Sequence, residues 1–219
     1  MTIRAVVFDL DGLMFDTEAL FFRASSEVLE SRGKRFTPEI MRALIGRRAA
    51  EVGHVLKAMT GLEEPVEHIQ AEVKERFYAE MDTAVHPTPG LFVLLDRLRQ
   101  CRLPLAVATS SSHAYAERLL IGHGLRDRFE FVLASEDVTR GKPDPQIYRL
   151  AAERFRVPPE ALLVLEDSPA GLAAAVGAGA IAIGVPHEHS PAEDLTTAFL
   201  VVPRLDDPAL LRLFATDDT

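Results

Sequence analysis

The chain has 219 residues, of which 47% are hydrophobic and 26% charged, a composition typical of soluble globular proteins. Its formal net charge of −9 comes without a dense basic stretch, which argues against nucleic acid and anionic membranes as partners. The single cysteine, Cys101, excludes an internal disulfide and a cysteine-based zinc site, and we expect a cytoplasmic protein.

The first predicted element is a strand over residues 3–9, and it ends in paired carboxylates. Asp9 and Asp11 stand two residues apart, so both side chains leave an extended backbone on the same side. Gly12 then lets the chain turn sharply. At ~4 Å and an effective dielectric constant near 20, two such charges repel by about 4 kcal/mol. Taken alone the pair is also typical of a solvated turn, but a strand end this acidic favours a bound cation.

A run of helices interrupts the strands after this point. Helical spacing predicts helices over residues 17–32, from Pro38 onward, over 49–60 and over 65–83. The run closes at "HPTPG", residues 86–90, a joint marked by proline and glycine. We therefore predict an all-α, four-helix type cap subdomain over residues 17–86, inserted into a core formed by residues 1–16 and 87–219.

Beyond the insertion, strands alternate with helices. The predicted strands cover residues 103–110, 129–135, 161–167, 180–185 and 199–203, and the helices cover 90–100, 112–122, 145–155 and 168–178. Nearly continuous apolar strands suit a parallel sheet covered on both faces, and the alternation predicts a doubly wound, Rossmann-like α/β core. The uncharged segment 168–186 is almost long enough to span a bilayer, but its glycines and its change of period predict a buried helix, a turn and a buried strand.

Polar side chains also end the later strands of the predicted sheet. Thr109 and Ser110 close the second strand at the start of a helix, where backbone N–H groups favour an anion. Lys142 lies in the loop "RGKPDP" after the third strand, and Glu166 and Asp167 close the fourth. Ligands of an open α/β sheet bind at the carboxyl ends of its strands, so we expect these groups to converge.

The chemistry of this set points to phosphoryl transfer. Oxygen ligands without histidine or cysteine select a hard ion, Mg²⁺ before Ca²⁺. Carboxylates, Mg²⁺, a lysine and an anion-binding turn together suit a phosphoryl group. Each motif alone has an ordinary explanation as a solvated turn, a helix N-cap or a surface lysine. Their occurrence together, each at a strand end, favours one shared site.

At these motifs the sequence resembles a known family. "DLDG", "ATSSS", "GKPDP" and "LEDSPAG" resemble the four ordered motifs of the haloacid dehalogenase superfamily, and "FDLDGLMFDTE" resembles its branch with a helical cap after the first motif. The resemblance implies that Asp9 is the nucleophile that forms an aspartyl-phosphate. It implies that Asp11 protonates the leaving oxygen and then activates water. Thr109 and the backbone of Ser110 would bind the phosphoryl group, and Lys142 would neutralise its charge.

The same resemblance implies a magnesium site. A carboxylate oxygen of Asp9, the backbone carbonyl of Asp11 and the side chain of Asp167 would hold the ion, with Glu166 as a further ligand or as a partner of a ligand. Dehalogenases of the superfamily lack the second aspartate and the metal carboxylates. Because Asp11 and Asp167 are both present here, dehalogenation is disfavoured.

Within this branch, small-molecule phosphatases and beta-phosphoglucomutase are the two alternatives. The mutase has a histidine where this chain has Phe21, and an arginine beyond a cap glycine where alignment on Gly46 gives Ala49. Both departures favour hydrolysis of a small phosphorylated metabolite, such as a sugar phosphate, over mutase-like phosphotransfer. A non-catalytic protein that binds a phosphorylated ligand is the third alternative.

The cap is expected to recognise the rest of the substrate. Glu18 and Arg47 are the candidates for facing the crevice, and ordinary solvated helix positions are the alternative for both. Phe21 and Phe22 are more typical of core packing than of substrate stacking. We take a monomer as the default state of the protein.

Overall fold

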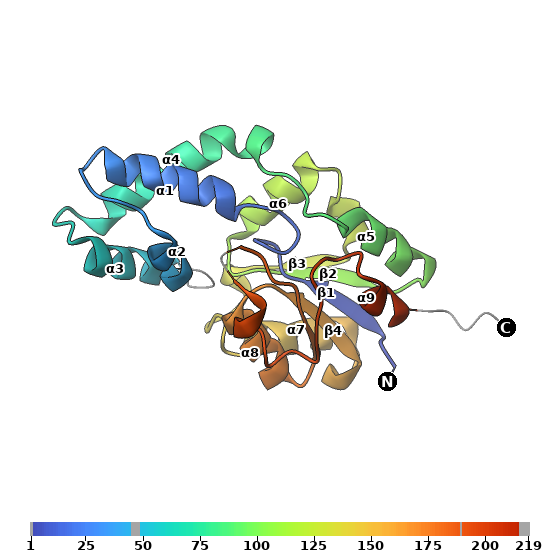
Figure 1. Cartoon of the computed structure of the whole chain (residues 1–219). Helices are drawn as coiled ribbons and strands as arrows, with labels where there is room; N and C mark the ends of the chain where they lie inside the picture. Colours follow the sequence, from blue (N-terminus) through green and yellow to red (C-terminus); the bar gives the residue numbers. More distant parts are fainter. Residues whose placement is uncertain (1, 45–48, 189, 215–219) are drawn as a thin grey trace.

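A parallel sheet organises the protein, whose computed structural model describes residues 2–44, 49–188 and 190–214 (Figure 1). Within these residues six strands form the sheet in the order β3-β2-β1-β4-β5-β6, and all neighbours run parallel. Their bounds are β1 Ala5–Phe8, β2 Leu105–Ala108, β3 Phe131–Leu133, β4 Leu162–Glu166, β5 Ile181–Gly184 and β6 Leu200–Val201. The strand order reverses between β1 and β4, which is where doubly wound sheets bind their ligands.

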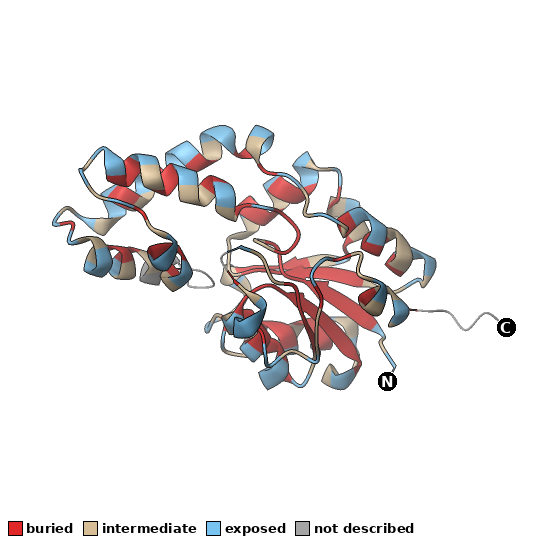
Figure 2. Cartoon of the chain, in the orientation of Figure 1, coloured by how far each residue is buried: buried red, intermediate tan, exposed pale blue. Residues whose placement is uncertain are grey.

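Both faces of the sheet are covered by helices (Figures 1 and 2). Side chains alternate between the faces, so Val6 and Phe8 of β1 belong to one apolar cluster, and Ala5 and Val7 to the other. The first cluster includes α5 (Leu91–Gln100), α6 (His113–Gly122) and α9 (Pro208–Arg212), and the second includes α7 (Gln146–Phe155) and α8 (Pro169–Ala178). The predicted doubly wound core is therefore confirmed.

The cap consists of helices that follow β1, and it lies beside the core at the left of Figure 1. Its helices are α1 (Glu18–Glu30), α2 (Pro38–Leu44), α3 (Ala49–Thr60) and α4 (Val66–Ala84). On α4, Ile69, Val73, Phe77 and Met81 recur every four residues and form a buried stripe. This stripe belongs to the same apolar cluster as one face of the sheet, so cap and core share their packing.

Two segments connect the cap to the core, and they are hydrogen-bonded to each other. Phe15, which leads into the cap, forms an antiparallel bridge with Pro87, which leads out of it. The N–H of Asp16 also donates to the carbonyl of His86 at 3.0 Å. The two connections therefore lie side by side.

The predicted elements are found with shorter strands. Each strand is two to four residues shorter than expected, as with 103–110, which is Leu105–Ala108, because the sequence pattern extends beyond the residues that pair in the sheet. The segment 168–186 forms α8 and β5, as predicted. Helix α9 was not expected, although Asp207 caps it by accepting from the N–H of Ala209 at 2.7 Å.

No helix in the described part of the chain is long and apolar enough to cross a membrane. The division at residues 16/17 and 86/87, with a core of 1–16 and 87–219 and a cap of 17–86, stays a prediction.

Candidate active site

The carboxyl ends of β1 and β4 bring three buried carboxylates together. Phe8 pairs with Leu165, and the N–H of Asp9 donates to the carbonyl of Leu165 at 3.0 Å, so Asp9 leaves the sheet beside the end of β4. One ligand oxygen from each of Asp9, Glu166 and Asp167 lies within 4.8 Å of the others. All three side chains are buried. The predicted convergence is therefore present in the structure.

Lys142 reaches this cluster from the loop between β3 and α7. Its side chain is only 3% exposed and forms an ion pair with Asp9 and, at 2.6 Å, with Glu166. The ammonium also donates to the carbonyl of Ala108 at 3.1 Å. Burial works against the charged ammonium, but Asp9 and Glu166 outweigh it and hold the pKa of Lys142 well above its usual value. Lys142 is therefore a fixed positive charge against the carboxylate of Asp9.

Glu166 is surrounded by donors on both of its oxygens. The hydroxyl of Tyr148 and the ammonium of Lys142 donate to Oε1, and the hydroxyl of Ser168 donates to Oε2 at 3.1 Å. A Cβ at Gly171, in the first turn of α8, would lie 1.9 Å from the carboxyl carbon of Glu166. A glycine is thus required there for Glu166 to fit. Tyr148 was missed by the sequence analysis, because nothing in its helical spacing separates it from ordinary core.

The carboxylates of this buried cluster outnumber its positively charged groups. Three carboxylates and one ammonium give a formal net charge of −2 for Asp9, Glu166, Asp167 and Lys142, and the adjoining pair of Glu18 and His187 adds charges that cancel. Burial raises the pKa of Asp9 well above its usual range, against the effect of Lys142, and the neighbouring carboxylates add to the rise. Burial likewise raises the pKa of Asp167 to about 7. A divalent cation would supply the missing charge, and these oxygen donors fit Mg²⁺.

Asp11 lies beside this cluster and is surrounded by hydroxyl groups. Thr17 and Tyr115 donate to its Oδ1 at 3.0 and 2.6 Å. Ser111 and Thr109 donate to its Oδ2 at 2.7 and 3.4 Å. Thr109 is predicted near the carboxylates from the sequence, but Thr17, Ser111 and Tyr115 are not. Thr17 and Ser111 belong to the motifs "FDLDGLMFDTE" and "ATSSS", whereas no motif includes Tyr115.

The turn after β2 leads from the sheet into α6, as predicted. The N–H of Thr109 still donates to Leu133 at 2.9 Å, and its side chain accepts from the N–H of Ser111 at 3.0 Å. Ser110 between them is half-buried. Ser112 then caps α6 by accepting from the N–H of Tyr115. Thr109 and Ser110 therefore stand between the carboxylates and a helix N-terminus.

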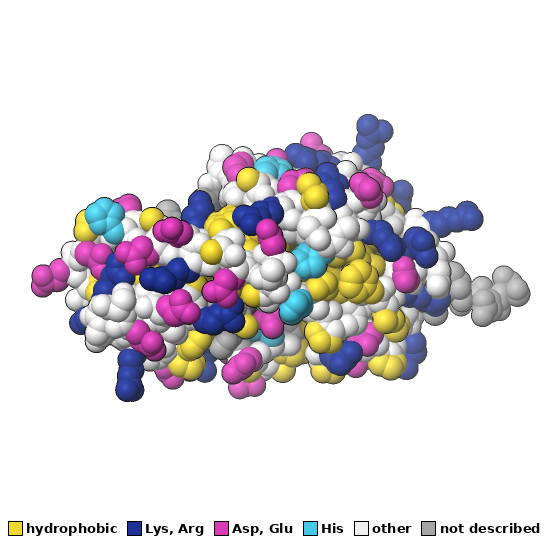
Figure 3. All heavy atoms as spheres, turned by 90° about the horizontal axis from the view of Figure 1, so that it is seen from above, with side chains coloured by type: hydrophobic (Ala, Val, Ile, Leu, Met, Phe, Trp, Pro, Cys, Tyr) yellow, Lys and Arg dark blue, Asp and Glu magenta, His cyan; other side chains and the backbone are white. Residues whose placement is uncertain are grey.

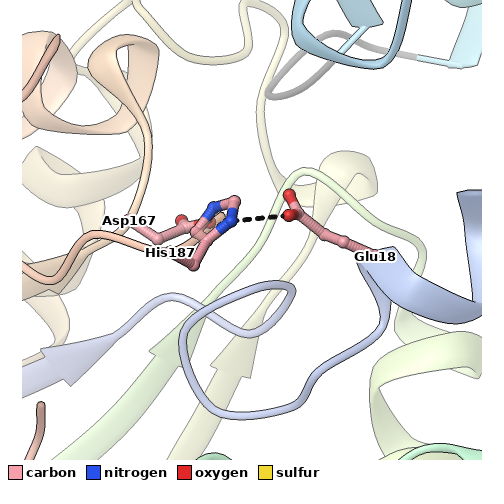
Figure 4. A group of neighbouring side chains, drawn as sticks. All are labelled: Glu18, Asp167 and His187. Carbon is pink, nitrogen blue, oxygen red and sulfur yellow. Dashed lines mark hydrogen bonds and ion pairs between the residues drawn. The ribbon is translucent and has the colours of Figure 1, made fainter. Parts of the chain in front are cut away.

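Glu18 takes part in a bridge from the cap to the site (Figure 4). His187, in the loop after β5, contacts Glu18 through Nδ1 at 2.8 Å and Asp167 through Nε2 at 3.0 Å. The two carboxylates outweigh the effect of burial and raise the pKa of His187 to about 10, so both ring nitrogens carry protons. Each ring nitrogen contacts a different carboxylate, so His187 forms an ion-pair bridge between Glu18 and Asp167.

This role of His187 is not predicted from the sequence. Glu166 and Gly184 are in register on β4 and β5, so residues shortly after each strand emerge next to each other. That register could have suggested His187 as a neighbour of Asp167. A cleft of about 250 Å³ adjoins the bridge, and its lining includes Gly12, Glu18 and His187.

The remaining predictions for the cap concern an arginine, two phenylalanines and the residue aligned with the mutase arginine. Arg47 lies outside the described residues. Phe21 and Phe22 pack against Phe36 with ring centroids 6.1 and 5.2 Å away, which is the predicted core packing. Ala49 begins α3. On the face shown in Figure 3, acidic and basic side chains are interspersed.

Replacing His187 by glutamine is expected to lower the free energy of unfolding by about 2 kcal/mol below about pH 6.5, because hydrogen bonds to charged groups are lost. The pKa of His187 is about 10 in the folded protein and about 6.5 in the unfolded chain, so this contribution is full below pH 6.5 and disappears as the pH rises through about 10. Thermal unfolding of the metal-free protein across this range measures it.

The control for this experiment is His68→Gln, which changes an exposed histidine on α4. It is expected to behave like the wild type at every pH. A loss in His187→Gln that stays constant up to pH 10 would contradict the ion-pair bridge.

Known hydrolases are similar to this chain in sequence over most of its length. The model of the haloacid dehalogenase-like hydrolase family matches residues 6–185. The phosphorylated carbohydrates phosphatase of Thermotoga maritima is 34% identical over 197 residues, covering 90% of this chain and 91% of that protein. The validoxylamine A 7'-phosphate phosphatase of Streptomyces hygroscopicus subsp. limoneus is 34% identical over 209 residues, covering 93% and 95%.

The fold is also found among solved structures. CbbY from Rhodobacter sphaeroides, in a crystal structure with phosphate, superposes with a TM-score of 0.79 at 30% identity. The match covers 96% of this chain and 100% of that one. The likeness therefore includes cap and core together.

Proposed function

The chain belongs to the haloacid dehalogenase-like hydrolase family, and from that premise we propose a magnesium-dependent phosphatase acting on a small phosphorylated metabolite, such as a sugar phosphate. The observation that carries the proposal is the pairing of Asp9 with Lys142 at the edge of an under-neutralised carboxylate cluster. A carboxylate held against a fixed ammonium is placed to attack phosphorus and to have the transferred charge neutralised. Two phosphatases at 34% identity support the same class of reaction.

The residues fit a bound Mg²⁺. Asp9, the backbone carbonyl of Asp11 and Asp167 would hold it, and when bound it supplies positive charge to the phosphoryl oxygens. Glu166 already accepts from Lys142, Tyr148 and Ser168, which favours the role of orienting Lys142 over that of a direct ligand.

In the proposed mechanism, the carboxylate of Asp9 attacks phosphorus and forms an aspartyl-phosphate. The bond to the leaving oxygen breaks, and that oxygen takes its electron pair and a proton from Asp11. Thr109 and the backbone of Ser110 hold the phosphoryl group, and Lys142 faces its developing charge. Asp11, now a carboxylate, takes a proton from water as the water attacks phosphorus and returns Asp9 to its free form.

The test is a phosphate-release assay with para-nitrophenyl phosphate, sugar phosphates, phosphoglycolate and nucleotides. We expect Mg²⁺ to be required and chelation to lower the rate at least about a hundredfold, with recovery when Mg²⁺ is restored. Full activity after exhaustive chelation would contradict the metal role.

The same assay separates hydrolysis from the alternatives. With a hexose 1-phosphate, a phosphatase releases free phosphate, whereas a mutase yields an isomer. Phe21, at the position of the mutase histidine, packs on Phe36, which favours hydrolysis. A protein that binds phosphorylated ligands without turnover would release nothing from the whole panel.

A further inference from the structure

Tyr115 contacts both Asp11, in the proposed site, and helix α4 of the cap. It stands in the first turn of α6, and its side chain is buried. Its hydroxyl donates to Oδ1 of Asp11 at 2.6 Å, across 104 positions of sequence. Burial and the nearby Asp11 raise the pKa of Tyr115 well above its usual value, so the hydroxyl keeps its proton.

The ring of Tyr115 faces the cap at the same time. Its centroid lies 6.0 Å from Phe77 and 6.1 Å from Tyr78, both on α4. These distances and the edge-to-face arrangement with Tyr78 are those of favourable aromatic pairs. One side chain of the core thus contacts both a cap helix and Asp11.

A second layer of contacts holds α4 against α6 at the surface. Arg118 on α6 forms a paired hydrogen bond with Asp82 on α4, at 3.0 and 2.8 Å. The same guanidinium lies 5.3 Å from the ring centroid of Tyr78. The position of Tyr115 is therefore fixed by its own helix and by the docked cap helix.

We propose that Tyr115 is a positioning residue that holds the carboxyl group of Asp11 for proton transfer, and that its ring makes this orientation depend on the docking of α4. The inference rests on the proposed function, in which Asp11 is the acid and then the base. Tyr115 acts through Asp11, and no contact with the substrate is assigned to it.

The chemistry of a phenol suits this task in both half-reactions. In the first, Asp11 gives its proton to the leaving oxygen as the P–O bond breaks, and the hydroxyl of Tyr115 donates to the carboxylate that forms. In the second, Asp11 takes a proton from the attacking water. A hydroxyl can rotate to accept from a protonated carboxyl, so one contact serves both states of Asp11.

The other three hydroxyls that contact Asp11 belong to residues outside helices, whereas Tyr115 lies within α6. Thr109 and Ser111 belong to the turn that is proposed to bind the phosphoryl group, and Thr17 directly precedes α1. Tyr115 alone among these four stands inside a helix, with its ring packed between neighbours. A side chain fixed in this way can transmit the position of α4 to Asp11.

The experiment compares two substrates of nearly the same shape, phenyl phosphate and para-nitrophenyl phosphate. The phenyl leaving oxygen is more basic and needs the proton from Asp11, whereas the nitrophenyl oxygen leaves readily without it. The ratio of kcat/KM for phenyl to that for nitrophenyl phosphate therefore measures proton donation during transfer to Asp9.

Tyr115→Phe keeps the ring and removes the hydroxyl, so we expect it to lower this ratio about tenfold. Tyr78→Leu removes an aromatic ring of α4 that packs on Tyr115, so we expect it to lower the ratio as well, but not to lower it further in the Tyr115→Phe background. Tyr78→Phe removes a hydroxyl from the neighbouring ring and is the matched control, with an unchanged ratio. Circular dichroism verifies that each variant is folded.

Several results would overturn the inference. An equal loss on both substrates in Tyr115→Phe would show a general structural role, and an unchanged Tyr115→Phe would show no role at all. If Tyr78→Leu leaves the ratio unchanged, the ring contact with α4 does not act on Asp11.

Asp11→Asn separates the inference from the function on which it rests. It is expected to lower the same ratio about a hundredfold. If Asp11→Asn leaves the ratio intact, the acid role of Asp11 itself is wrong. If it lowers the ratio while Tyr115→Phe does not, the proposed function stands and only the role of Tyr115 fails.

Discussion

Replacing Asp9 by asparagine is expected to lower kcat by a factor on the order of 10⁴ or more while the protein stays folded. An amide is too weak a nucleophile to form the phosphorylated intermediate. Its carbonyl oxygen still accepts from Lys142, because asparagine has the same shape. The raised pKa of Asp9 means that the folded, metal-free protein disfavours this charge, so a neutral group there does not destabilise it.

The measurement is the rate of phosphate release together with acid-quenched mass spectrometry of the protein. The wild type is expected to show a phosphate adduct on the peptide containing Asp9 during turnover, and Asp9→Asn to show none. Asp127→Asn, at an exposed aspartate before β3, controls for the loss of a carboxylate. A phosphate adduct on any other residue of the wild type would contradict the assignment of Asp9.

Replacing Lys142 by methionine is expected to lower the free energy of unfolding by about 3–5 kcal/mol at neutral pH and kcat/KM by about 10²–10³-fold. The substitution leaves Asp9 and Glu166 buried with no ammonium between them. The loss of stability is greatest at neutral pH. It shrinks as the pH falls, because Asp9, whose pKa burial raises, then takes up a proton and part of the uncompensated charge disappears.

A double-mutant cycle separates the charge effect from packing. Lys142→Met combined with Glu166→Gln removes one charge of each sign, so the pair is expected to lose less stability than the two single variants together. Lys74→Met, at an exposed lysine of α4, is the control for the side-chain change. Additive losses in the cycle would contradict direct coupling of Lys142 to Glu166.

Much of the site could be predicted because it depends on strand ends. Parallel strands in a doubly wound sheet all present their carboxyl ends to one edge, so Asp9, Thr109 and Asp167 were placed together by topology alone. Lys142 was predicted at the same edge because its loop follows the third predicted strand. The strands themselves were predicted too long because the apolar run continues past the last ladder hydrogen bond, as the two-residue β6 illustrates.

The contacts that the sequence did not predict depend on which face each helix presents to the site and on the path of each loop. Tyr115 reaches Asp11 only because α6 presents that face to the site, and a buried tyrosine in a helix is indistinguishable by pattern from core. His187 depends on the path of an irregular loop. Helical spacing predicts the cap helices, but it does not predict their contacts with the core, such as those between α4 and α6.

The paired connections at Phe15 and Pro87 have a mechanical consequence. Two segments tied together by backbone hydrogen bonds would act as one hinge, so any change in the orientation of the cap would turn about this connection. Such a turn would change the separation of Glu18 from His187, which belong to the cap side and the core side of the connection. The Glu18–His187 ion pair would then stabilise the orientation in which the cap lies against the site.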